Sequence, residues 1–236
     1  RLRRQLATPP AAVARTVWSS GVSCIDEMLP ERGFRSGSLV EWLGEPGSGI
    51  STLVWLLAIH WQSSRSVIVI DPGRECFPPG AAHLGADLRR MLIIQPTGTE
   101  ETLWSVEQSL RCRAASVVLC RLDRLSPQAF RRFQLAVEQG GGLGLFVRPV
   151  RYRRDPSWAD VRFACVAAEP QDSAKSPLSQ PQVSLARRLQ VELLHVRGGG
   201  FRQQTKVMSI NDEAHTVSVD SQLVGAATAG PAARAS

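Results

Sequence analysis

Residues 44–52 have the composition and spacing of a phosphate-binding loop. Glycines at this spacing let backbone N–H groups face an anion, and the N-terminus of a following helix adds a partial positive charge. The sequence therefore predicts a nucleotide or phosphate site. The residues expected to form it are Gly44, Gly47, Ser48, Gly49, Ile50, Ser51 and Thr52.

The loop lacks the lysine that this chemistry needs. In the frame G-x-x-x-x-G-K-[ST], Ile50 stands where the cation belongs. The lysines of the chain, Lys175 and Lys206, lie far along the sequence. A lost charged hydrogen bond costs about 1.5–3 kcal/mol, so we expect no cofactor beyond weak ATP or phosphate binding. The loop thus has two interpretations, a weakened nucleotide or phosphate pocket and a purely structural strand-to-helix turn inherited from an ATPase, and we favour the structural turn.

Strands and helices alternate on both sides of the loop. An apolar strand at 39–43 precedes it, and a helix at 52–61 follows it. Further strands are expected at 66–71, 91–94, 117–120 and 143–147, with helices at 100–113 and 127–139. This order predicts an α/β fold with a mainly parallel, doubly wound sheet.

Beyond Pro156 the pattern changes to strands without intervening helices. Strands at 160–167 and 189–196, and a hairpin at 206–210 and 214–219, predict a small antiparallel C-terminal part. The expected organisation is a basic N-terminal arm at 1–16, a core at 17–168, a flexible loop at 169–186, antiparallel strands at 187–222 and a disordered tail at 223–236.

The composition is that of an ordinary globular domain. Of 236 residues, 43% are hydrophobic and 21% charged, and no apolar run is long enough to span a bilayer. The five cysteines include no C-x-x-C pair, and the four histidines are scattered. We therefore expect reduced thiols, a cytoplasmic location and no metal site.

The net charge of +7 admits phosphate-rich partners. Arginines surround one tyrosine at the end of the strand at 143–147, and open α/β sheets bind ligands at the carboxyl ends of their strands. We expect a nucleic-acid or acidic-partner contact there, with an ordinary solvated loop as the alternative. The residues are Arg148, Arg151, Tyr152, Arg153 and Arg154. Further on, Trp158 is expected to anchor the last strands to the core, with a partner-binding role as the alternative.

The order of these strands and helices and the residues of their motifs resemble the recombinase core of the RecA superfamily over about residues 19–165. Residues 20–26 resemble its S-T-G-x-x-x-L-D lead-in, and 33–41 resemble the G-G-[LI]-P-x-G-x-[IL]-x-E segment. Residues 70–72 and 84–96 are similar to its I-D-A-E, L-G-v-D and L-x-x-x-Q-P stretches. The resemblance implies a RecA-like P-loop fold.

The functional positions of that superfamily do not carry over. The loop lysine falls on Ile50, the general-base glutamate on Gly73 with Glu75 displaced, the magnesium aspartate on Cys120 and the γ-phosphate-sensing glutamine on Pro149. The DNA-binding loop that follows in the superfamily is also shorter in this sequence. The resemblance therefore implies a degenerate nucleotide site with no catalytic residue and no ATP hydrolysis.

Within the superfamily the chain resembles the ImuA group of RecA-like mutagenesis proteins. The likeness lies in Leu29-Pro30, in the helix at 129–136, and in the segments 157–162 and 187–199 with the late hairpin. It implies a non-catalytic accessory protein of DNA-damage-induced (SOS) translesion synthesis. The implied partners are an ImuB-like polymerase homologue, RecA and an alternative replicative-type DNA polymerase, with single-stranded DNA as an open further partner.

Two other functions stay open. One is a divergent DNA-dependent ATPase of recombination or repair. The other is a cell-division inhibitor, because the ImuA and SulA groups share a likeness to recombinases.

Overall fold

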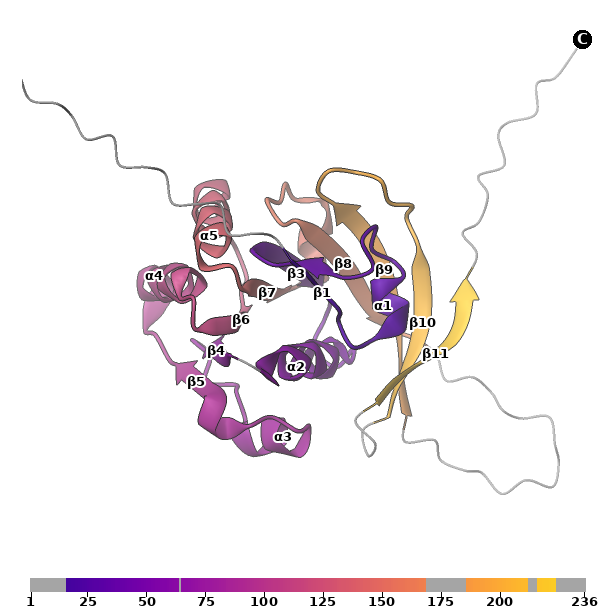
Figure 1. Cartoon of the computed structure of the whole chain (residues 1–236), viewed down its shortest axis with the longest axis horizontal. Coiled ribbons are helices and arrows are strands. Elements are labelled where there is room, and N and C mark those ends of the chain that lie inside the picture. Colours follow the sequence, from indigo (N-terminus) through magenta and orange to yellow (C-terminus); the bar gives the residue numbers. More distant parts are fainter. Residues whose placement is uncertain (1–15, 64, 169–185, 212–215, 224–236) are drawn as a thin grey trace, which may run out of the picture.

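A computed structural model describes residues 16–63, 65–168, 186–211 and 216–223. Its centre is a nine-stranded sheet, beside which β1 (Val17–Trp18) and β2 (Phe34–Arg35) form a short antiparallel ribbon (Figure 1). In spatial order the strands of the large sheet are β11 (Thr216–Leu223), β10 (Thr205–Asn211), β9 (Ala186–Val196), β8 (Val161–Ala167), β3 (Ser38–Leu43), β7 (Leu143–Arg148), β6 (Ala115–Arg121), β4 (Ser66–Ile70) and β5 (Met91–Ile94).

The sheet is mostly parallel, which confirms the predicted fold class. Strands β8, β3, β7, β6, β4 and β5 run parallel, and β9, β10 and β11 continue the same sheet in antiparallel fashion. The antiparallel prediction for β8 is confirmed on one side only: β8 pairs antiparallel with β9, but it pairs in parallel with β3, which places Val161 opposite Val40. The chain leaves β7 on one side of β3 and returns on the other. The residue pattern of β8 gives no sign of this crossover, so the sequence alone does not show that β8 runs parallel to β3.

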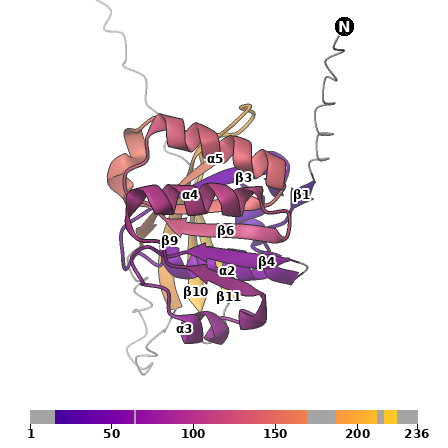
Figure 2. The ribbon, with the colours of Figure 1, turned by 90° about the vertical axis from the view of Figure 1, so that its left-hand side faces the viewer.

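Helices cover both faces of the sheet. One face carries α1 (Ser23–Asp26) and α2 (Ile50–His60), and the other carries α4 (Gly98–Arg111) and α5 (Pro127–Gly140), which lie side by side in Figure 2. The remaining helical segments are α3 (Pro78–His83) and the 3₁₀ turns η1 (Trp61–Ser63), η2 (Leu88–Arg90) and η3 (Val150–Arg154).

Alternating side chains of the strands divide the interior into two cores. Val40 and Trp42 of β3 face α2, whereas Leu39 faces α4 and α5. In the first core the indole of Trp42 stacks on Phe163 of β8, with ring centroids 4.3 Å apart. In the second, Phe146 of β7 packs against aromatic rings of α5. Such double burial is typical of a parallel sheet.

Several expectations concern segments outside the described residues. The N-terminal arm, apart from its last residue, lies outside them, as do most of the predicted loop at 169–186 and nearly all of the tail at 223–236. Within the described ranges, no helix is long and apolar enough to cross a membrane.

The stack between β3 and β8 yields a stability prediction. Trp42 is fully buried, and its indole N–H has no hydrogen-bond partner in the described structure. Trp42→Ala should lower the free energy of unfolding by about 3–5 kcal/mol, because it leaves a cavity. Trp42→Phe should cost less than half as much, because it keeps a ring and removes an unpaired donor. Urea unfolding measures both, and equal losses would contradict this account.

Candidate functional site at the phosphate loop

Glycines shape the turn between β3 and α2. The N–H of Gly44 donates to the carbonyl of Arg148 over 3.0 Å, which ties the loop to the end of β7. A Cβ on Gly44 would lie 2.9 Å from the Cys165 carbonyl oxygen. Gly47 and Gly49 have φ angles of +83° and +91°, a left-handed region that favours glycine. The sequence therefore folds locally as predicted, into a strand–loop–helix unit.

The side chain at the lysine position turns into the protein. Ile50 is the first residue of α2 and is fully buried in the core beneath the loop. Its neighbour Ser51 is exposed, and Thr52 is half-buried. The loop can therefore offer hydroxyls and backbone N–H groups to an anion, but Ile50 offers no charge.

A pocket of about 120 Å³ lies beside the loop at the carboxyl ends of β4, β6 and β7. Burial and, to a smaller degree, the Asp71 carboxylate raise the pKa of the Cys120 thiol to about 12. A neutral thiol is a poor magnesium ligand, since Mg²⁺ prefers oxygen donors. Both oxygens of Asp71 already accept backbone N–H groups, from Glu75 at 2.9 Å and Cys76 at 3.0 Å.

The nearby carboxylates are engaged with arginines. Glu75, the displaced candidate base, pairs with Arg121 at 3.1 Å. Asp123, which follows β6, pairs with Arg151 of η3. Among the described residues, no group of three or more His, Cys, Asp or Glu side chains is arranged to hold a metal ion.

An arginine from a distant strand reaches the loop, and sequence reasoning missed it. The Nη2 of Arg187 in β9 donates to the Thr52 hydroxyl over 3.1 Å, although 135 positions separate the two residues. Arg187 also lines a second pocket of about 460 Å³ between α2 and α3. The two pockets share Trp55, Glu75 and Cys76. No local sequence pattern predicts this contact, because Arg187 reaches α2 only when β9 pairs into the sheet.

One residue of the expected basic surface after β7 lies inside the protein. Arg148 is only 2% exposed and pairs with the buried carboxylate of Glu41 on β3. Arg162 of β8 pairs with the same carboxylate. The prediction of a ligand contact was therefore wrong for Arg148, because Glu41 holds its guanidinium inside the protein.

The other four residues of this surface lie on η3. Tyr152 lies between two guanidiniums, those of Arg148 at 4.6 Å and Arg151 at 5.1 Å from its ring centroid. Arg153 pairs with Glu192 of β9 at 2.7 Å. Arg154 is exposed, and no carboxylate of the described residues pairs with it. A nucleic-acid contact at η3 stays a prediction, with Arg154 the cation best placed for it.

Known proteins resemble this chain over part of its length. No family model matches it. The RecA protein of Rhodopirellula baltica is 28% identical over 102 residues, 43% of this chain and 27% of that protein. RecA of Chlorobium limicola is 32% identical over 113 residues, 47% and 32% of the two chains. RecA of Chlorobaculum tepidum is 24% identical over 170 residues, 62% and 49%.

The matched part covers between about a quarter and a half of the length of these relatives. Together with the mostly parallel sheet, the partial homology to RecA proteins supports a place in the RecA-like superfamily.

A second stability prediction concerns the buried cluster of Glu41, Arg148 and Arg162. Glu41→Gln should destabilise the fold by about 3–5 kcal/mol, because two arginine charges lose their buried partner. Glu31→Gln is the matched control, since Glu31 pairs with Arg35 at the surface, where a pair contributes under about 1 kcal/mol. Denaturant unfolding measures both variants. Equal effects would show that the buried cluster does not stabilise the fold.

Thiol reactivity tests the environment of Cys120. Its pKa, raised to about 12, leaves almost no thiolate at pH 8, whereas Cys112 is exposed. A chromogenic disulfide reagent at pH 8 should therefore modify Cys112 quickly and Cys120 only after unfolding. Mass spectrometry locates the label, and Cys112→Ser should remove the fast phase. Rapid labelling of native Cys120 would contradict its burial.

Proposed function

We propose that this chain is a non-catalytic, RecA-like accessory protein of DNA-damage-induced translesion synthesis, of the ImuA kind. One observation carries the proposal: the residue at the lysine position of the loop, Ile50, is fully buried and apolar. The partial homology to RecA proteins supports the scaffold. The motifs at 129–136, 157–162 and 187–199 support the narrower group.

The proposal follows from what phosphoryl transfer requires. Charge that develops on the transferring group needs a cationic clamp and a metal, and water needs a base. Ile50 supplies no clamp, the neutral Cys120 thiol is a poor metal ligand, and Glu75 is paired with Arg121. We infer that the protein acts through contacts rather than turnover.

The partners we propose are an ImuB-like polymerase homologue, RecA and an alternative replicative-type polymerase, with single-stranded DNA in addition. Several arginines are exposed and therefore available to phosphate-rich or acidic surfaces.

One observation favours a second candidate, a divergent ATPase. Arg187 brings a guanidinium to Thr52, and the adjoining pocket of about 460 Å³ falls within the size range of ligand sites. Arg187 could replace the missing lysine as a phosphate ligand. Under the first, non-catalytic proposal, a nucleotide retained in this way is bound weakly and not hydrolysed, whereas under the second it is hydrolysed.

Phosphate release from radiolabelled ATP separates the two candidates. The purified chain should release no more phosphate than buffer alone, with or without single-stranded DNA. Equilibrium dialysis should detect at most weak ATP binding, which Arg187→Ala should lower several-fold, because it removes a charged donor. DNA-stimulated turnover that Arg187→Ala abolishes would overturn the non-catalytic proposal and favour the ATPase.

Co-purification tests the proposed partners. The tagged full chain should retain the ImuB-like homologue from the same genome, and added ATP should not alter the amount retained. An unrelated RecA-fold protein with the same tag is the control. Failure to retain the homologue from purified components would contradict the translesion role, and stoichiometric inhibition of FtsZ polymerisation would replace it with the cell-division alternative.

A further inference from the structure

The strongest unexplained surface feature is an indole flanked by two guanidiniums. Trp158, in the loop before β8, is 39% exposed, although the sequence predicts a core anchor there. The Cζ atoms of Arg131 and Arg197 lie 5.1 and 6.0 Å from the centroid of its ring. The buried anchor is instead its neighbour Ala159, 2% exposed, so the expectation for Trp158 was wrong.

The backbone presents this indole in a defined position. The Ser157 hydroxyl accepts a hydrogen bond from the N–H of Ala159 over 3.1 Å, which closes the turn around Trp158. Asp160 then accepts the N–H of Leu39 at 2.9 Å and pairs with Arg197 at 3.3 Å. The turn is thereby joined to β3 and to the end of β9. We call Arg131, Trp158 and Arg197 the Trp158 stack.

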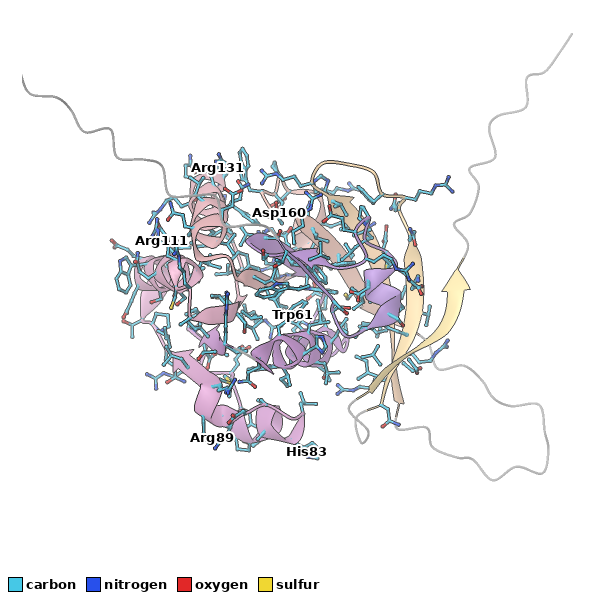
Figure 3. The ribbon with its side chains drawn as sticks, in the orientation of Figure 1. Trp61, His83, Arg89, Arg111, Arg131 and Asp160 are labelled. Atoms are coloured by element: carbon cyan, nitrogen blue, oxygen red, sulfur yellow. The ribbon has the colours of Figure 1, made fainter. Side chains whose placement is uncertain are left out.

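The Trp158 stack carries positive charge on the outer surface. Arg131 lies on the exposed side of α5 (Figure 3) and hydrogen-bonds the neutral side chain of Gln134. In the part of the chain that the structure describes, no carboxylate pairs with Arg131. Arg197 has Asp160 as a partner but keeps 38% of its side chain exposed.

We propose that the Trp158 stack is a binding site for single-stranded nucleic acid. A base would stack on the indole in place of one guanidinium, and the displaced guanidinium would pair with the adjoining phosphate. Unpaired strands expose the faces of their bases, and aromatic rings beside arginines are the side chains that bind them without sequence preference. The proposal rests on the proposed function for one partner, single-stranded DNA, and deepens it by naming the residues that would bind that strand.

The same geometry argues against two other occupants. Duplex DNA hides its base faces, so Trp158 would add little to duplex binding. An acidic protein would pair with the arginines and leave the ring contact unused. The site also differs from η3, where Tyr152 is only half-exposed and one of the two arginines beside its ring, Arg148, is buried.

Fluorescence anisotropy with a labelled 20-nucleotide oligothymidine tests the proposal on the full chain. Trp158→Ala should weaken binding about 5- to 100-fold, as expected for the loss of one stacked base. Trp158→Phe should keep most of the affinity, and Trp158→Leu should not. Arg131→Gln should reduce the salt dependence by about 0.7, the slope for one phosphate contact with a single strand.

The matched control is Trp104→Ala. Trp104 lies on α4 and is 60% exposed, and in the described residues no arginine stacks on it. It should leave the affinity unchanged. An equal loss from Trp104→Ala and Trp158→Ala would overturn the proposal, as would full displacement of the oligomer by polyglutamate or by duplex DNA at equal charge.

Photocrosslinking gives a readout that does not depend on variants. An oligomer carrying 5-iododeoxyuridine should crosslink to Trp158 of the unmodified protein, and peptide mass spectrometry would locate the adduct. Crosslinks confined to η3 would place the strand elsewhere and overturn the proposal. Neither result bears on ATP turnover or on retention of the polymerase homologue, so this inference and the proposed function fail separately.

Discussion

The pairing of the Glu41 carboxylate with two arginines holds together the strands that lead to the phosphate loop. The carboxylate is fully buried and pairs with Arg148 of β7 and Arg162 of β8, the strands on either side of β3. Removing three charges from water is costly unless their hydrogen-bonding groups are satisfied. The backbone contributes to this, because the carbonyls of Asp123, Tyr152 and Asp155 accept further N–H groups of the two guanidiniums. One carboxylate thus unites three strands and η3.

This cluster also holds the phosphate loop without help from a ligand. The carbonyl of Arg148 accepts the N–H of Gly44, so the residue that pairs with Glu41 also fixes the start of the loop. On the other side, Arg187 of β9 bonds the Thr52 hydroxyl. The shape of the loop is therefore set by its neighbours in the sheet, and loss of the lysine removes charge without removing the scaffold.

Local patterns predicted most of the fold, and long-range pairing accounts for the errors. The apolar run of β4 and the glycines at 44–49 identify a strand and a turn from a few adjacent residues. Arg148 is buried because it pairs with Glu41, which lies 107 positions earlier in the chain. Its charge alone suggested a place on the surface. The direction of β8 and the contact of Arg187 were hidden for the same reason. Exposure of Trp158 likewise depends on how the turn before β8 meets α5.

The central sheet divides the interior of the protein into two separate cores. Its two faces pack into separate cores, with α2 and the loop on one side and α4 and α5 on the other. Packing is tight within each core, so substitutions couple strongly to their own neighbours and weakly across the sheet. A protein built this way can therefore change residues on one face of the sheet while the core on the opposite face keeps its packing.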